Sequence, residues 1–270
     1  MTQAFVVGHP VTHSLSPALH RAAYAIMGLD WTFQAVDVPE GALAAFVAGR
    51  DAEWRGLAIT MPHKIAVVKL GRPDAAVRRL GVGNTLLFGP EGATVHNTDV
   101  SGFLQALAYR RVDDASDALL LGAGATARAA LMALNNLGVL RVTAQVRDQA
   151  RAADWLGLAD DLGLEASVEP LGTPHETDLL ISTLPAGAAD AHTALVDHAG
   201  AVMDVCYDPW PTKLTQAGAA VGLPVVTGLD LLAGQAIQQI DLMAGDTVGI
   251  DVLIDAGMTE LARRATQPMA

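Results

Sequence analysis

The sequence has few cysteines, few aromatic residues and little positive charge. Its one cysteine, Cys206, excludes a disulfide framework and favours a reducing, cytoplasmic compartment. Aromatic residues make up 4% of the chain and hydrophobic residues 51%, so we expect a core of Ala, Val and Leu, as in soluble α/β proteins. Lys and Arg number 17 against 29 Asp and Glu, a net charge of −12. Nucleic acid and anionic membranes repel such an acidic chain and are therefore poor candidate partners. An anionic small substrate would need local cations to bind.

Long hydrophobic runs are also missing. No stretch approaches the ~18 consecutive apolar residues of a membrane span. The first ten residues, MTQAFVVGHP, have no basic region and too short an apolar run for a signal peptide. We therefore expect a soluble, intracellular protein.

Short apolar runs alternate with helical patterns, an order typical of parallel sheets covered by helices. The expected strands are 4–7, 31–36, 56–59, 84–88, 118–122, 141–146, 178–182, 201–205 and 224–227. The expected helices include 17–28, 40–48, 125–137 and 212–221.

A domain boundary is indicated near residues 98–117, where an amphipathic helix is followed by an acidic, polar break. After residue 228 the pattern is wholly helical. We predict an α/β domain over 1–100, a Rossmann-like, doubly wound parallel-sheet domain over 101–235, and C-terminal helices over 236–270 that pack back onto the first domain.

The segment LLLGAGATARAA predicts a nucleotide site, because a G-x-G-x-x-A pattern follows a strand and opens a helix. Gly122 suits the tight turn, Gly124 lets the backbone approach a pyrophosphate, and Ala127 allows close helix–strand packing. The N–H groups at the helix start would then hold phosphates, so we expect the cofactor along 122–126, that is Gly122, Ala123, Gly124, Ala125 and Thr126.

The end of the next strand bears on the choice of cofactor. An acidic residue there binds the ribose 2′-OH of NAD, whereas an arginine accepts the 2′-phosphate of NADP. Arg147 and Asp148 are adjacent in QVRDQAR. We expect NADP from Arg147, and NAD stays possible because of Asp148. A pair of solvated surface charges is the alternative.

Two segments of the first domain contain polar groups suited to catalysis. In GLAITMPHKIAV, Pro62 occupies an expected first helical position, so Lys64 falls in the first turn, where a cation opposes the helix macrodipole. Such a lysine either extends into solvent or is held there for chemistry. In VHNTDVSGF, Asp99 or Thr98 either caps the next helix or, in the case of Asp99, pairs with Lys64 at the mouth of a cleft.

The opening loop, VVGHPVTHSLSPALH, contains two serines and three histidines. Ser16 precedes Pro17 and suits a helix N-cap as well as a ligand-binding role. His9, His13 and His20 raise the possibility of zinc, but their spacing spans a loop and a helix and no cysteine helps. We therefore expect no metal.

Seven segments occur in the order and spacing of shikimate dehydrogenases: VVGHPVTHSLSPALH, GLAITMPHK, GVGNTL, HNTDVSGF, GAGATARA, MDVCYDPWPTKL and GLDLLAGQA. The resemblance runs from about residue 5 to 240. It implies the reversible, NADP-linked oxidation of shikimate to 3-dehydroshikimate, with the substrate bound by the first domain and NADP by the second.

The resemblance also implies roles for single residues. Ser14 and Ser16 match the serines that bind the substrate carboxylate, and Lys64 matches the acid/base, with Thr60 at the substrate. Residues implied at the ring hydroxyls are Asn84 and Asp99, the latter as partner of Lys64. Residues implied to reach the substrate from the second domain are Tyr207 and Gln235, and those at the nicotinamide end are Val205 and Gly228.

One departure from the family pattern leaves alternatives open. The usual Asn-Arg-Thr after the second nucleotide strand reads Val146-Arg147-Asp148, which removes a hydroxyl and adds a carboxylate near the expected 2′-phosphate. An NAD-linked quinate/shikimate or aminoshikimate dehydrogenase is therefore an alternative. A non-catalytic nucleotide-binding regulator is a further one, and a homodimer is left open.

Overall fold

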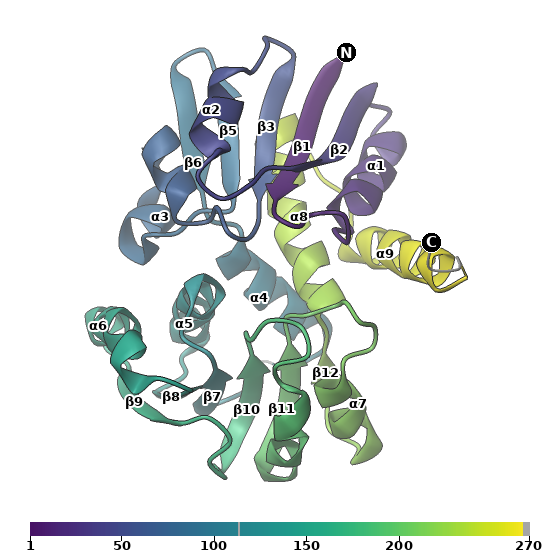
Figure 1. Cartoon of the computed structure of the whole chain (residues 1–270). Helices are drawn as coiled ribbons and strands as arrows, with labels where there is room; N and C mark the ends of the chain where they lie inside the picture. Colours follow the sequence, from purple (N-terminus) through teal and green to yellow (C-terminus); the bar gives the residue numbers. More distant parts are fainter. Residues whose placement is uncertain (113, 267–270) are drawn as a thin grey trace. The chain divides into compact units, whose positions relative to one another are not determined.

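The computed structural model describes residues 1–112 and 114–266, which form two compact units (Figure 1). Unit 1 comprises Met1–Thr98 and the chain from Leu232 onward, and unit 2 comprises Asp99–Leu231. Asp113, in the expected polar break, and 267–270, at the end of the expected C-terminal helices, lie outside the described residues. No described helix combines the length and the apolar character needed to span a membrane.

Unit 1 contains a six-stranded sheet in the order β2-β1-β3-β5-β6-β4. The strands are β1 (Thr2–Gly8), β2 (Trp31–Asp37), β3 (Trp54–Ile59), β4 (Arg72–Pro73), β5 (Thr85–Gly89) and β6 (Gly92–His96). β1 is parallel to β2 and β3, but β5 is antiparallel to β3 and β6, so the expectation of a wholly parallel sheet is wrong here. The two-residue connection of β5 to β6 is too short for a parallel crossover, so these two strands are antiparallel.

The helices of unit 1 are α1 (Ser16–Ile26), α2 (Leu43–Ala48), α3 (Ala75–Leu80), a 3₁₀ helix (Ala66–Leu70), most of α8 (Gly228–Ala244) and α9 (Ile250–Ala265). The C-terminal helix α9 packs against α1 (Figure 1). One face of the sheet forms an aliphatic core that includes Val7, Leu57, Leu86 and Val95. This core fixes the strand ends that carry the polar residues described below.

Unit 2 contains a second six-stranded sheet in the order β12-β11-β10-β7-β8-β9, and all its pairs are parallel. Its strands are β7 (Asp117–Leu121), β8 (Arg141–Val146), β9 (Glu165–Pro170), β10 (Thr177–Ser182), β11 (Ala199–Asp204) and β12 (Val225–Val226). Its helices include α4 (Asp99–Tyr109), α5 (Ala125–Leu137), α6 (Ala153–Leu162) and α7 (Lys213–Ala220). This order is that of a Rossmann fold, and it confirms the predicted doubly wound sheet.

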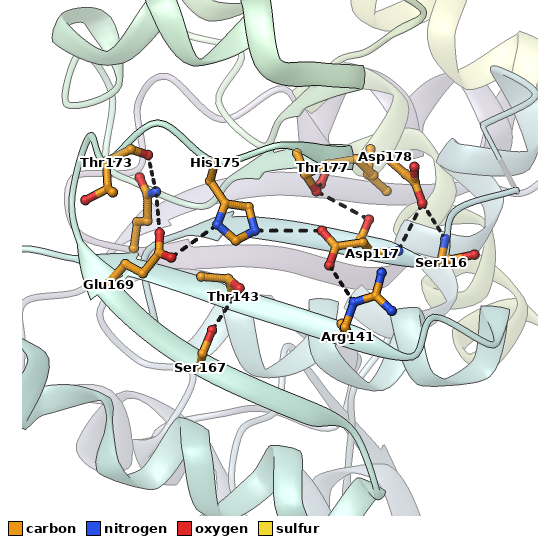
Figure 2. A network of polar contacts seen from close by, with 12 residues as sticks. Ser116, Asp117, Arg141, Thr143, Ser167, Glu169, Thr173, His175, Thr177 and Asp178 are labelled. Atoms are coloured by element: carbon orange, nitrogen blue, oxygen red, sulfur yellow. Dashed lines mark hydrogen bonds and ion pairs between the residues drawn. The ribbon is translucent and has the colours of Figure 1, made fainter.

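The connection from β9 to β10, residues 171–176, crosses β8 and β7 without a helix. His175 lies on it between two carboxylates, with Nδ1 3.2 Å from Glu169 Oε1 and Nε2 3.9 Å from Asp117 Oδ1 (Figure 2). At the other end of the connection, Gln145 Nε2 donates to the Thr173 carbonyl at 2.6 Å. Polar side chains thus hold this crossover where a helix would use apolar packing.

Candidate active site

The predicted residues of unit 1 come from one edge of its sheet. β1 and β3 end there at Gly8 and Ile59, and the antiparallel β5 begins there, with Thr85 opposite Ala58. The loops after β1 and β3 approach closely, since a Cβ on Gly8 would lie 2.8 Å from the Met61 carbonyl oxygen. Any side chain at position 8 would therefore push the two loops apart.

The serine loop lies directly after β1. Helix α1 begins at Ser16 with Leu15 in the N-cap position, so the interpretation of Ser16 as the N-cap is wrong. Instead, Ser14 Oγ accepts the Ser16 N–H at 3.3 Å. A hydroxyl that accepts in this way keeps its own O–H to donate. Both serines are buried.

The catalytic lysine expected after β3 lies in a turn rather than in a helix. Residues 61–65 form turns, and a 3₁₀ helix begins only at Ala66, so the helix-dipole argument for Lys64 is wrong. The buried His63 fixes the turn because its Nε2 donates to the Val38 carbonyl at 2.7 Å. The Lys64 carbonyl accepts the Gly83 N–H at 2.8 Å, which holds Lys64 beside the segment that carries Asn84.

Asn84 is the centre of a buried polar cluster with Thr98 and Gln235. Its Oδ1 accepts the Thr98 N–H at 2.7 Å, and its Nδ2 donates to Gln235 Oε1 at 2.8 Å and to Thr98 Oγ1 at 2.9 Å. These bonds fix which way the amide points. Gln235 belongs to unit 1, so the expectation that it would reach the substrate from the second domain is wrong. The reason is that α8 returns the chain to unit 1 four residues earlier than expected.

Gln239, which the sequence analysis missed, extends this cluster into the core. Its Nε2 donates to Thr85 Oγ1 at 3.0 Å and to the Asn84 carbonyl at 3.2 Å. Its Oε1 therefore accepts from His20 Nε2 at 3.3 Å, and His20 Nδ1 accepts from the Tyr24 hydroxyl at 3.4 Å. Burial lowers the pKa of His20 to about 3, so the ring is neutral. The four-residue spacing of Gln235 and Gln239 on one helix was the available signal.

The histidines of the opening loop point to different partners. His9 Nδ1 lies 2.7 Å from Asp37 Oδ2, whereas His20 is enclosed in the core and stacks on Phe33. Within 1–112 and 114–266, no group of three His, Cys, Asp or Glu side chains is arranged to hold a metal ion.

Asp99 and Tyr207 belong to unit 2. Asp99 is buried and is the first residue of α4, directly after Thr98 of the polar cluster. Tyr207 is partly exposed in the segment after β11. The structure thus brings the turn of Lys64 to Asn84 and Gln235, while the pairing of Lys64 with Asp99 stays a prediction.

The expected phosphate site lies where β7 meets α5. Gly122 has φ +103°, and a Cβ there would lie 2.8 Å from Thr183 Oγ1, so the turn requires glycine. Gly124 is the N-cap of α5 without a side-chain cap, and a Cβ on it would meet no atom within 4 Å. The first turn of α5, which includes Ala125 and Thr126, therefore presents backbone N–H groups beside open space, as a bound phosphate requires.

The residues expected at the two ends of the cofactor are also placed within unit 2. Arg147 is exposed directly after β8. Asp148 caps the following 3₁₀ helix (Gln149–Ala152), because its Oδ1 accepts the Ala150 N–H at 3.1 Å. Gly228 lies against Val205, whose carbonyl oxygen leaves no room for a Cβ at position 228. The residues expected at the two ends of the cofactor thus follow β8 and β11 of one parallel sheet, and their roles stay a prediction.

Comparison with known proteins agrees with this arrangement. Residues 6–86 match the shikimate dehydrogenase substrate binding domain. The chain is 36% identical over 272 residues to the shikimate dehydrogenase (NADP(+)) of Thermus thermophilus, covering 98% of this chain and 99% of that one. The crystal structure of shikimate 5-dehydrogenase from the same organism in complex with NADP(H) and shikimate has a TM-score of 0.84 at 32% identity, covering 96% and 99% of the two chains.

Two further solved structures have the same fold. The shikimate dehydrogenase of Mycobacterium tuberculosis has a TM-score of 0.87 at 33% identity, with 96% of this chain and 100% of that chain covered. The 5-ketofructose reductase of Gluconobacter sp. strain CHM43 has a TM-score of 0.84 at 25% identity, covering 96% and 98%. Identity above 30% over nearly the whole chain confirms the resemblance seen in the seven motifs. The chain therefore belongs to the shikimate dehydrogenase family.

Proposed function

We propose that the protein catalyses the reversible, NADP-linked oxidation of shikimate to 3-dehydroshikimate. The observation that carries this proposal is the buried cluster of Asn84, Thr98 and Gln235 beside the turn of Lys64. Buried amides held in one orientation suit a substrate with several hydroxyls, since a site that hydrogen-bonds a hydroxyl strongly rejects analogues without it.

The cluster can exchange its internal bonds for bonds to substrate. A ring hydroxyl that enters between the two amides can accept from Asn84 Nδ2 and donate to Gln235 Oε1, in place of their direct bond of 2.8 Å. At the other end of the substrate, Ser14 and Ser16 donate to the carboxylate. Thr60 and Tyr207 complete the substrate site in this proposal.

Lys64 is the proposed acid/base of the reaction. Oxidation of a secondary alcohol removes one proton from oxygen and one hydride from carbon, and Lys64 Nζ receives that proton. Asp99 stabilises the ammonium form of Lys64 and holds the amine toward the substrate. In the reverse direction, Lys64 returns the proton to the forming alkoxide.

NADP supplies the hydride acceptor when it is bound. Residues 122–126 hold its pyrophosphate, Arg147 its 2′-phosphate, and Val205 and Gly228 lie at its nicotinamide end. The cap formed by Asp148 explains how this chain tolerates a carboxylate beside Arg147, because Oδ1 is directed to Ala150 N–H. NADP is therefore favoured over NAD.

The same proposal assigns the domains. Unit 1, which comprises Met1–Thr98 and the chain from Leu232 onward, binds substrate and contains Lys64, and unit 2, Asp99–Leu231, binds NADP. We also propose a cytoplasmic location from the one cysteine and the acidic composition. A homodimer is tested by size-exclusion chromatography with light scattering.

Absorbance at 340 nm tests the activity directly. Purified protein is assayed with shikimate or quinate, and with NADP or NAD, and we expect the largest kcat/KM for shikimate with NADP. In the reducing direction, 5-ketofructose is offered with NADPH, because a structural neighbour is named for that substrate. A preference for 5-ketofructose or quinate, or no turnover with any pair, would contradict the proposal.

A further inference from the structure

The serine loop is held by a helix at the opposite end of the sequence. Arg264, in the last turn of α9, donates from Nη1 to the His13 carbonyl at 2.7 Å and from Nη2 to the Ser14 carbonyl at 3.0 Å. One planar guanidinium therefore fixes two consecutive peptide groups of the loop. One of these peptides belongs to Ser14 itself.

Glu260 fixes the guanidinium in turn. Arg264 Nε donates to Glu260 Oε1 at 2.8 Å, one helical turn earlier on α9. The hydrogen bond from Arg263, with a further one from Arg264, lowers the pKa of Glu260 to about 2 although burial opposes the shift. Glu260 is therefore ionised throughout the neutral range. All three nitrogen atoms of the Arg264 guanidinium donate hydrogen bonds, to Glu260 and to the carbonyls of His13 and Ser14.

A second carboxylate holds the start of the same loop. Asp37, at the end of β2, accepts the Val11 N–H at 3.1 Å and contacts His9 at 2.7 Å. Between these two attachments the loop closes on itself, since the Ser14 N–H donates to the Val11 carbonyl at 2.9 Å. The Ser14 and Ser16 hydroxyls are thus positioned by bonds that reach both ends of the loop.

We propose that Arg264, held by Glu260, is a positioning residue that orients Ser14 and Ser16 for the substrate carboxylate. This inference rests on the proposed function, in which the two serines bind that carboxylate. Arg264 acts through the peptide groups of residues 13 and 14. A carboxylate needs both hydroxyl donors aimed at it, so a loop that loses one attachment binds the anion less well.

Helix α9 offers a matched control in the neighbouring arginine. Arg263 forms two hydrogen bonds of 2.7 Å with the same Glu260, but its side chain is about half exposed. Both of these bonds lie within α9, and neither reaches the serine loop. Arg263→Ala removes the same charge and the same helix partner as Arg264→Ala. The two variants differ in the bonds to the serine loop.

Steady-state kinetics with shikimate at saturating NADP compares these variants. We expect Arg264→Ala to raise KM for shikimate about tenfold, the size of one charge-assisted hydrogen bond, with kcat within about twofold of wild type. Arg263→Ala should leave both constants within about twofold. Arg264→Lys should fall between them, because an ammonium cannot contact two carbonyls as a planar fork does.

Shikimate methyl ester shows whether the effect concerns the carboxylate. In wild type, esterification should weaken binding, and in Arg264→Ala that penalty should shrink, because the carboxylate site is already impaired. A merely structural role for Arg264 predicts equal losses for shikimate and its ester, and that result would overturn the inference. Should Arg264→Ala not fold, the same comparison of shikimate with its methyl ester is made on Arg264→Lys, where a smaller decrease of the penalty is expected.

Ser14→Ala and Ser16→Ala separate a failure of this inference from a failure of the proposed function. If the serine variants raise KM for shikimate and Arg264→Ala behaves as Arg263→Ala does, Arg264 has no positioning role while the proposed function stands. If the serine variants leave KM unchanged, the proposed carboxylate site is wrong and the role of Arg264 is wrong with it.

Discussion

The two candidate binding regions of the molecule are built in opposite ways. In unit 1, buried side chains bond to one another, from Tyr24 through His20, Gln239 and Thr85 to Asn84 and Gln235. In unit 2, the expected cofactor edge consists of backbone N–H groups, Gly124 beside open space, and the exposed Arg147. One region is a closed network and the other is an open surface.

This difference follows from what each region is proposed to recognise. A phosphate is a symmetric anion that backbone N–H groups and a guanidinium can hold with little buried structure. A ring with several hydroxyls presents donors and acceptors in one arrangement, so the amides that bind it must be held in one orientation. Changes in unit 1 should therefore spread through the network, whereas changes in unit 2 should stay local.

The largest expected effect concerns Lys64. Lys64→Ala should lower kcat by about 10²–10⁴, since it removes the proton acceptor, while the Kd for shikimate stays within about tenfold. Stopped-flow kinetics and equilibrium titration measure the two quantities separately. Turnover like that of wild type would remove Lys64 from the mechanism and leave the buried amides as binding groups alone.

The next effect tests the network through the pH dependence of stability. The pKa of His20 is 6.5 in the unfolded chain and about 3 in the folded protein, because burial disfavours the imidazolium. Below pH 6.5 the unfolded state binds a proton that the folded state does not, so this contribution to stability is complete above pH 6.5 and is lost as the pH falls toward 3. Between pH 7 and pH 5 it amounts to about 2 kcal/mol.

Urea unfolding at several pH values measures the contribution of His20 to the free energy of unfolding. His20→Asn removes the titrating ring, so the free energy of unfolding should decrease less between pH 7 and pH 5 than it does in wild type. If wild type and variant lose stability in parallel, the imidazole of His20 is not the group that titrates. The description of the network as closed around a neutral His20 is then wrong.

The sequence predicted the strands and the turn of unit 2 better than the polar network of unit 1, because local patterns determine the former and long-range contacts the latter. The Gly122–Gly124 turn and the apolar runs at 118–121 and 179–181 are local signals, because each is set by neighbours in the chain. Gln239 and Arg264 act on Asn84 and Ser14 across the length of the sequence, and no local pattern marks such contacts. The strand expected at 84–88 is present as β5, but its antiparallel direction was not predicted, because an apolar run does not reveal direction.

Local signals also failed where polar residues alternate. Strand β9 reads EASVEP, and it lies at the sheet edge with partly exposed side chains, so it lacks the apolar run that marked its neighbours. The helix expected at Pro62 is a turn because His63 is drawn to the Val38 carbonyl, a contact between separate loops. In both places tertiary structure overrode the local pattern.

Arg147 tests whether changes at the open surface stay local. Arg147→Ala should lower kcat/KM for NADP by about tenfold, because a charge-assisted contact with the 2′-phosphate is lost, and leave kcat/KM for NAD nearly unchanged. The midpoint of thermal unfolding should not move. Equal losses with both cofactors would show that Arg147 supports the adenosine site in another way, and a wild-type preference for NAD would overturn the assignment of NADP.

The smallest expected effect separates the two roles of Asp148. As an N-cap, its carboxylate satisfies the Ala150 N–H, and as a charge it repels a phosphate bound at Arg147. Asp148→Asn keeps a good cap and removes the charge, whereas Asp148→Ala removes both, at a cost of about 1 kcal/mol in stability. We expect Asp148→Asn to lower KM for NADP about twofold to threefold, with stability unchanged, since exposed charges interact weakly. KM for NAD should not change, because NAD has no 2′-phosphate to repel.

If Asp148→Asn leaves KM for NADP unchanged, the cap directs the carboxylate away from the phosphate so completely that Asp148 has no part in cofactor choice. If instead KM for NAD rises, Asp148 contacts the ribose hydroxyl, and the edge of unit 2 accepts either cofactor.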